Sequence, residues 1–190
     1  MISSFIWLAV AAAVLLYGIV IYNGLVSLKH GVTKAWSNID VLLKQRHDEL
    51  PKLVETCKQY MQFERDTLEK VMKARSGAQT AREAGDVKGV GAAEGLMRAG
   101  LGGIVATVEA YPELKANQSI QQLLGRITGL ENAISDRREF YNETVNVNNV
   151  RIEQFPDVIV ARLLGFKSAV LLEFSEEEKR DVDMKALFNS

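Results

Sequence analysis

Residues 2–22 read ISSFIWLAVAAAVLLYGIVIY, and the first charged side chain of the chain is Lys29. A helix of about 20 apolar residues is long enough to cross the hydrocarbon core of a bilayer, which is roughly 30 Å thick. We therefore predict a transmembrane anchor over residues 1–22. A cleaved signal peptide is the alternative, but it needs basic residues before a shorter apolar core. No Lys or Arg precedes the run, and its apolar stretch continues past the small-residue triplet Ala11–Ala13.

Basic residues are concentrated after this run. Lys29 and Lys34 lie close to its C-terminal end, Lys44 and Arg46 lie slightly farther along, and only the Met1 amine precedes it. Because Lys and Arg near a span tend to remain in the cytoplasm, the C-terminal domain is expected there. A periplasmic or extracellular domain remains the alternative.

Composition predicts a helical domain after the span. The chain has 23 basic and 24 acidic residues, a net charge of −1, and few prolines. This balance gives no reason to expect nucleic acid as a partner. Strand-like alternation is absent, whereas apolar residues recur with helical spacing. The fold class we predict is all-α: an N-terminal transmembrane helix that continues into an elongated antiparallel helical bundle over residues 23–166, followed by a tail over residues 167–190.

A single stripe of apolar residues dominates the first part of this bundle. From Leu25 to Ala78 the stripe residues are separated by three or four positions, which predicts one long helix over residues 23–82. Pro51 removes a backbone hydrogen bond and should kink or interrupt that helix. A helix of this length cannot bury its stripe alone, so it needs partner helices from this chain or from other chains.

Two more helices are predicted. The second covers residues 87–111 after a turn within residues 77–89, and its many glycines indicate either loose helicity or close packing. The third follows the linker Pro112–Asn117, carries a stripe from Ile120 to Phe155, and ends near Pro156.

The C-terminal part combines a helical, an apolar and a charged segment. Residues 157–166 are expected to add a further turn or two of helix. The apolar patch Ala169–Leu172 with Phe174 precedes a run of charges. This tail is interpreted as a solvated, partly disordered end, or alternatively as a segment that docks through Phe174, Leu187 and Phe188.

Polar residues interrupt the apolar stripes. Buried charges are costly unless they are paired and hydrogen-bonded, so we expect a structural network between helices that fixes their register. The expected members are Arg46, Glu64, Arg75, Glu131, Arg137, Arg138 and Tyr141.

Motifs for catalysis or metal binding are absent from the sequence. His30 and His47 do not belong to Glu-x-x-His pairs, and there is no HExxH, CxxC, Walker loop or Gly-x-Ser-x-Gly. The single cysteine, Cys57, cannot form an intrachain disulfide and is interpreted as a small core residue. We therefore predict no enzymatic activity, no cofactor and no metal.

Several local strings, taken together, resemble the LemA family over roughly residues 22–166 and the preceding anchor. The strings are Trp36, Ile39-Asp40, Arg46, Leu50-Pro51, Leu53, Glu64 and Ala74-Arg75, then Tyr111-Pro112-Glu113-Leu114-Lys115-Ala116-Asn117, and then LENAISDRREFYNETVNVNNVRIEQFP over residues 130–156. The resemblance implies a bacterial protein with a membrane anchor and an elongated helical bundle, but it implies no reaction. Some relatives act in building membrane compartments such as magnetosomes. The departures from the family lie at residues 89–103 and after residue 166.

The leading hypothesis is a structural or scaffold protein of the bacterial inner membrane that self-assembles and organises or shapes the bilayer. Its expected partners are the lipid bilayer and further copies of itself. The alternative is a membrane-tethered adaptor for another protein, such as an envelope-stress or proteolysis component, with its docking site at Ala169–Phe174 or on the glycine-rich helix. A helical enzyme or metal protein is the third hypothesis.

Overall fold

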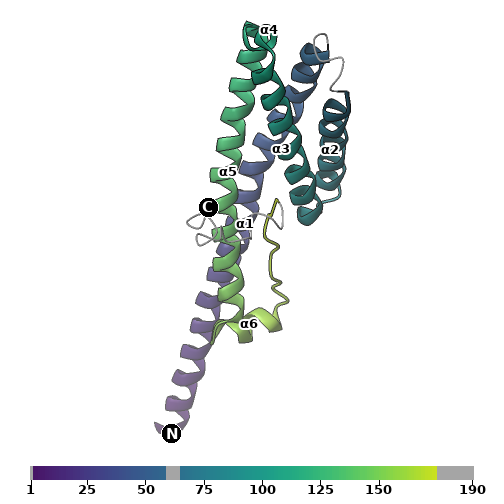
Figure 1. The fold of residues 1–190 in the computed structure, drawn as a ribbon. Helices are drawn as coiled ribbons and strands as arrows, with labels where there is room; N and C mark the ends of the chain where they lie inside the picture. Colours follow the sequence, from purple (N-terminus) through teal and green to yellow (C-terminus); the bar gives the residue numbers. More distant parts are fainter. Residues whose placement is uncertain (1, 59–64, 175–190) are drawn as a thin grey trace, which may run out of the picture. The chain divides into compact units, whose positions relative to one another are not determined.

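The computed structural model describes residues 2–58 and 65–174, and these are helical apart from short turns and the segment after residue 163. The helices are α1 (Ile2–Lys58), α2 (Arg65–Glu83), α3 (Val87–Ala110), α4 (Pro112–Lys115), α5 (Gln118–Glu153) and α6 (Asp157–Leu163) (Figure 1). No strand occurs within the described ranges, and the predicted all-α class is confirmed.

Two compact units share helices α1 and α5. Among the described residues, the first unit comprises residues 2–39 and 137–171, and the second comprises residues 40–58, 65–136 and 172–174. Each unit is considered by itself below.

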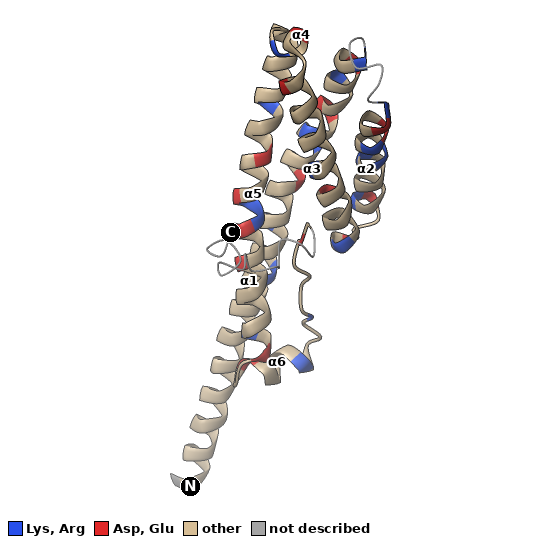
Figure 2. Cartoon of the chain, in the orientation of Figure 1, with Lys and Arg blue, Asp and Glu red and all other residues tan. Residues whose placement is uncertain are grey.

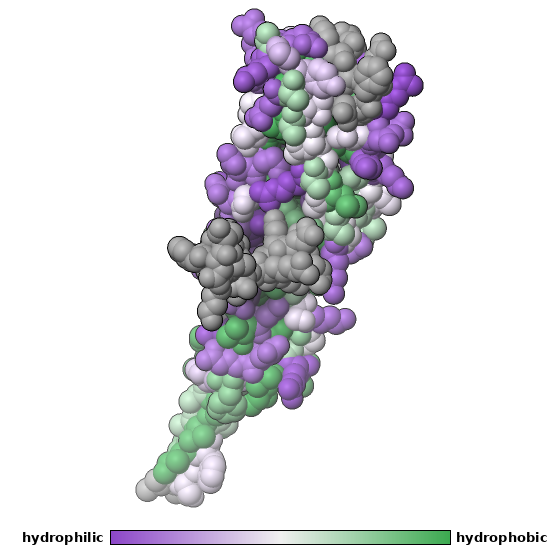
Figure 3. Space-filling model, in the orientation of Figure 1, coloured by the Kyte–Doolittle hydropathy of each residue, from purple (hydrophilic) through white to green (hydrophobic). Residues whose placement is uncertain are grey.

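The apolar run is the first part of α1. This part of the helix carries no charged side chain (Figure 2), and hydrophobic residues cover much of its surface (Figure 3). Its most apolar 18-residue window is only 6% buried, and by length and composition the helix could cross a membrane. The helix continues without a break through Asn23 and Gly24.

Helix α1 also continues through Pro51 and extends to Lys58, so of the kink or interruption predicted at this proline, the interruption is not seen. A proline inside a helix leaves the carbonyl four residues earlier without its usual N–H partner. That carbonyl belongs to His47, and the Arg75 guanidinium donates a hydrogen bond from Nε to it at 2.8 Å. The side chain of Arg75 therefore replaces the hydrogen bond that Pro51 cannot make.

The prediction of one helix over residues 23–82 is wrong, because α2 runs antiparallel to α1 in the second unit. Arg75 contacts His47, and seven residues later Arg82 Nε lies 2.7 Å from Asp40 Oδ1. The stripe spacing is the same on both helices, and residues 59–64 contain neither Gly nor Pro. The sequence therefore carries no signal for the reversal.

Glycine allows α3 to approach α2 closely. The α2–α3 turn uses Gly85 at φ +68°, and Asp86 then caps α3 by accepting a hydrogen bond from the Gly89 amide at 3.0 Å. A Cβ atom at Gly100 would lie 2.6 Å from Val71 Cγ2. The close-packing interpretation of the glycine-rich helix is therefore correct, and α3 is regular over its whole length.

The string Tyr111–Asn117 forms the corner between α3 and α5. Tyr111 ends α3, and Pro112 starts the short helix α4 where a linker was expected. Leu114 is buried, and Asn117 Oδ1 accepts hydrogen bonds from the Ser119 and Ile120 amides at 3.0 and 3.2 Å. This capping of free helical N–H groups explains why an Asn stands where α5 begins.

Helices α1 and α5 run antiparallel in each unit. In the second unit Arg46 pairs with Glu131, and Glu49 pairs with Arg126. Apolar residues of α1 and α5 form the core of this unit together with α2, α3 and α4. In the first unit the aromatic rings of Trp36 and Tyr141 lie 5.5 Å apart. A small core there is formed by Ile21, Leu25, Ile152 and Ala161, the last of which belongs to the expected helical turn, α6.

The segment after α6 reaches the second unit at Leu172. Leu172 and Phe174 are buried, and the main chain of Glu173 crosses α3 directly over Gly91, where a Cβ atom would collide with the Glu173 carbonyl. Up to residue 174 the structure supports the docking interpretation of this tail, because Leu172 and Phe174 are buried and the Glu173 main chain lies on the chain's own α3. Leu187 and Phe188 lie outside the described residues.

The α2–α3 contact predicts opposite effects at two neighbouring glycines. Gly100→Ala should lower the free energy of unfolding by about 1–3 kcal/mol, because its methyl group collides with the stiff, buried Val71. At Gly102 a Cβ atom would have no neighbour within 4 Å, so Gly102→Ala should raise the free energy of unfolding by up to about 1 kcal/mol through its higher helix propensity. Urea unfolding in detergent, followed by circular dichroism, measures both. Equal effects of the two variants would contradict close α2–α3 packing.

Candidate functional site

Arg46 of α1 belongs to the second unit and is completely buried. Its guanidinium forms ion pairs with Glu94 of α3 and Glu131 of α5. Arg98 Nε lies 3.9 Å from the other carboxylate oxygen of Glu131. The cluster Arg46, Glu94, Arg98 and Glu131 thus joins α1, α3 and α5, and its formal charges cancel.

Burial lowers the pKa of the Arg46 guanidinium, and the charge of Glu131 opposes that shift. An arginine starts from so high a pKa that it remains protonated at neutral pH. Its two carboxylate partners supply the compensation that a buried cation requires. Because Arg46 engages both carboxylates, this arrangement favours a structural role over proton transfer.

A second ion-pair group lies one helical turn from the first. The buried carboxylate of Glu49 lies 2.6 Å from Arg126 of α5 and 3.1 Å from Lys52 of its own helix. Sequence reasoning missed Glu49 and Glu94. Glu94 could have been found, since it occupies the apolar stripe of α3 between Val90 and Met97.

The other expected network residues lie elsewhere. Arg75 donates a hydrogen bond to the His47 carbonyl, and within the part of the chain that the structure describes it has no ion pair with a carboxylate. Arg137 is exposed, although its position on the stripe predicted burial, and Arg138 is half-buried. Glu64 lies outside the described residues. The structure therefore brings together Arg46 and Glu131 from the expected set.

Tyr141 belongs to the first unit and has a different role. It is buried, and its hydroxyl donates a hydrogen bond to the Val170 carbonyl at 2.8 Å. Burial raises the pKa of this phenol. The Asn149 side chain holds the same segment through hydrogen bonds with the Ala169 amide and carbonyl, at 2.8 and 2.9 Å. Together these contacts attach the segment after α6 to α5.

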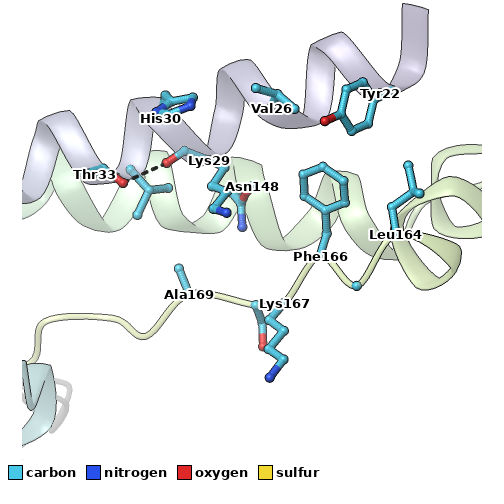
Figure 4. Close-up of a pocket in the computed structure, with 13 residues that line it drawn as sticks. Tyr22, Val26, Lys29, His30, Thr33, Asn148, Leu164, Phe166, Lys167 and Ala169 are labelled. Atoms are coloured by element: carbon cyan, nitrogen blue, oxygen red, sulfur yellow. Dashed lines mark hydrogen bonds between the residues drawn. The ribbon is translucent and has the colours of Figure 1, made fainter. Parts of the chain in front are cut away.

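A cavity of about 640 Å³ lies in the first unit between α1, α5 and this attached segment (Figure 4). The Phe166 ring meets the Tyr22 ring edge-on, with centroids 6.0 Å apart. Lys29, His30 and Lys167 line the cavity, and no Asp or Glu is among its lining residues. The cavity therefore combines apolar walls with basic groups, a combination that suits an amphipathic or anionic ligand.

Cys57 and His47, whose side-chain types often act in catalysis, lie in environments that do not favour reactivity. Cys57 is buried in the core, and burial raises the pKa of its thiol to about 11, which disfavours the reactive thiolate. Burial, with a contribution from Arg75, lowers the pKa of His47. Within residues 2–58 and 65–174, no three His, Cys, Asp or Glu side chains are grouped as a metal site would require.

These features define an all-α protein with an apolar N-terminal helix and a helical unit held together by a buried Arg–Glu cluster. A model of the LemA family matches residues 35–185. The chain belongs to the LemA family, and the resemblance noted in its sequence is confirmed. The matched region includes Arg46, Glu94 and Glu131, whereas the apolar run at residues 2–22 lies outside it.

Similar proteins include magnetosome proteins. The magnetosome proteins MamQ 1 and MamQ 2 of Paramagnetospirillum magneticum AMB-1 are each 23% identical to this chain over 171 residues, which cover 78% of this chain and 63% of the relative. The protein LemA of Metamycoplasma hominis is 28% identical over 169 residues, with 88% of this chain and 75% of the relative covered. The chain thus spans less than two thirds of the MamQ proteins.

The buried cluster predicts a large effect at Arg46. Arg46→Met should lower the free energy of unfolding by about 3–5 kcal/mol, because the buried Glu94 would lose its cation and Glu131 would keep only the more distant Arg98. Lys58→Met removes only an exposed pair with Glu55 and should change it by less than about 1 kcal/mol. Urea unfolding of the three proteins checks this difference. An Arg46→Met protein as stable as the Lys58→Met control would be incompatible with a structural cluster.

The link between Arg75 and Pro51 predicts that two substitutions interact. Arg75→Met should lower the free energy of unfolding by about 1–3 kcal/mol, because the His47 carbonyl loses its hydrogen-bond donor. Pro51→Ala supplies an amide that can donate to the same carbonyl, so Arg75→Met should cost less in that background. A double-mutant cycle of unfolding free energies measures the difference. Purely additive effects would contradict the replacement of one donor by the other.

Proposed function

We propose that this chain is a membrane-anchored structural protein of the bacterial inner membrane, which associates laterally with copies of itself and thereby organises or shapes the bilayer. One observation carries the proposal: the first part of α1 exposes a continuous apolar surface that nothing else in the described chain covers. The magnetosome names of the MamQ relatives support a role connected with a membrane compartment.

The anchor is not separated from the domain by a turn. Ile21 and Leu25 lie on the same helix as the apolar run and pack against Ile152 and Ala161 of the first unit. A cleaved leader would be expected to end before the folded domain begins, so this shared helix favours an uncleaved span. Lys29 and Lys34 follow the span and favour a cytoplasmic domain.

Self-association is supported by a second exposed surface in the first unit. Phe140, Val147 and Val150 of α5 are exposed large apolar residues, separated by seven and three positions, as in a coiled-coil seam. Beside Val147 and Val150 lies a shallow groove of about 590 Å³, which is also lined by the small residues Gly24 and Ser27. Small residues allow another helix to approach closely.

An adaptor function remains the second candidate, but the structure changes which surfaces are open to a partner. Phe174 is buried, and Gly91 and Gly100 of the glycine-rich helix face Glu173 and Val71 of the same chain. Part of each expected docking site is therefore occupied within the chain, whereas Val170 and Leu171 of the segment after α6 and Leu96 of α3 are exposed. An adaptor could use these exposed residues or the α5 surface of Phe140, Val147 and Val150.

The proposal predicts an anchored oligomer. Full-length protein in bacterial membranes should resist extraction by alkaline carbonate, and light scattering in detergent should give a mass above that of the monomer at several concentrations. Val147→Glu with Val150→Glu should shift the mass towards the monomer, because charges in an apolar contact are costly. Val105→Glu, on an exposed position of α3, serves as the control.

Three outcomes separate the hypotheses. Release by carbonate would overturn the anchor. A strict monomer at all concentrations would overturn self-association. Crosslinking in cells that recovers a stoichiometric, non-self protein through Val147 and Val150 would favour the adaptor.

A further inference from the structure

Large apolar side chains are exposed around α6 in the first unit. Phe155, in the turn before α6, is 77% exposed, and Ile159 and Leu163 of α6 are 59% and 81% exposed. Ile159 and Leu163 lie four positions apart, on the same face of the helix, and Phe155 continues the same spacing. Leu164 follows and is also exposed. We call Phe155, Ile159, Leu163 and Leu164 the α6 ridge.

The opposite side of α6 fixes its position along α1. Ala161 is buried and, with Val160, packs in the core of Ile21, Leu25 and Ile152. Ile21 is next to the last residue of the apolar run, so α6 is attached where the proposed span ends. If residues 2–22 cross the hydrocarbon core, this level is the boundary between hydrocarbon and headgroups.

Aromatic and basic groups accompany the ridge at this level. The Tyr22 and Phe166 rings pack together beside Leu164 (Figure 4). Arg162 and Lys167 are exposed, and Lys29 lines the neighbouring cavity with Lys167. Aromatic rings and long cationic side chains are typical of the interfacial zone, where the apolar part is buried and the charge reaches lipid phosphates.

We propose that the α6 ridge is a second membrane contact, which inserts into the interfacial layer of the bilayer while Arg162 and Lys167 bind the phosphates of anionic lipids. This inference rests on the proposed span of α1, whose exposed apolar surface is continuous with the α1 segment that holds α6. Interfacial insertion of a short apolar helix buries surface that would otherwise face water. Such a contact fixes both the depth and the rotation of α1 in the bilayer.

Depth-dependent quenching tests the proposal on the full-length protein. Single cysteines are introduced at Leu163, at Leu16 in the span, and at Leu96, an exposed leucine of α3, and each is labelled with an environment-sensitive fluorophore. Cys57 is buried, and unsubstituted protein measures its background labelling. The proteins are reconstituted in phosphatidylcholine vesicles with or without phosphatidylglycerol, and with lipids that carry a quencher near the headgroup or, in a parallel set, in the acyl chain.

The expected result is blue-shifted emission and loss of emission to the lipid quencher at Leu163→Cys and Leu16→Cys, but not at Leu96→Cys. Ile159→Cys repeats the measurement one helical turn away. Quenching of the Leu163→Cys label by aqueous iodide, with the Leu16→Cys label still quenched by lipid, would overturn the ridge alone. An unquenched Leu16→Cys label would overturn the span itself. Disulfide-linked dimers through Leu163→Cys would assign the ridge to a second copy and overturn the lipid contact.

A separate experiment tests whether Arg162 and Lys167 bind anionic lipid headgroups. Phosphatidylglycerol should increase the loss of emission at Leu163→Cys, and Arg162→Gln with Lys167→Gln should abolish that increase without changing Leu16→Cys. Lys73→Gln, on an exposed position of α2, is the matched control. Equal emission with and without phosphatidylglycerol would overturn the anionic headgroup contact.

Discussion

The buried Arg46 guanidinium is the constraint on which the second unit depends. A cation with no access to water is stable only if carboxylates reach it from the surrounding elements. Here they come from α3 and α5, so three helices must keep the same register for either ion pair to exist. Alternative helix packings that slide by one turn would leave a charge unpaired. We expect these ion pairs to contribute more to the choice of one packing than to its net stability.

A related constraint acts at the proline of α1. Because Pro51 has no N–H group, it cannot donate a hydrogen bond to the His47 carbonyl, and Arg75 of α2 donates one instead. The apparent defect in α1 thus becomes a specific contact point for α2. Together with the pair of Arg82 and Asp40, this contact determines which face of α2 packs against α1.

Helix type and most helix ends were predictable, because they follow from apolar spacing, Pro112, Gly85 and Asp86. The burial of Arg46 followed from its place on the stripe. The reversal between α1 and α2 was not predictable, since both helices carry the same spacing and the connecting residues include no usual turn former. The stripe that buries Glu94 is hard to recognise in the sequence, because glycines interrupt the apolar spacing of α3. The exposure of Arg137 depends on which side of α5 its neighbours occupy, and only tertiary packing decides that.

The division of the chain has a consequence for its synthesis. The first unit is assembled from residues 2–39 and residues 137–171, with nearly all of the second unit between them in the sequence. Domains fold as they leave the ribosome, beginning with those completed first. Residues 40–136 therefore emerge and can form the Arg46 cluster while the first forty residues still lack their α5 and α6 partners. During that interval Ile21 and Leu25, at the end of the apolar run, still lack the cover that Ile152 and Ala161 later provide, so the first unit can close only after residues 40–136 have been made.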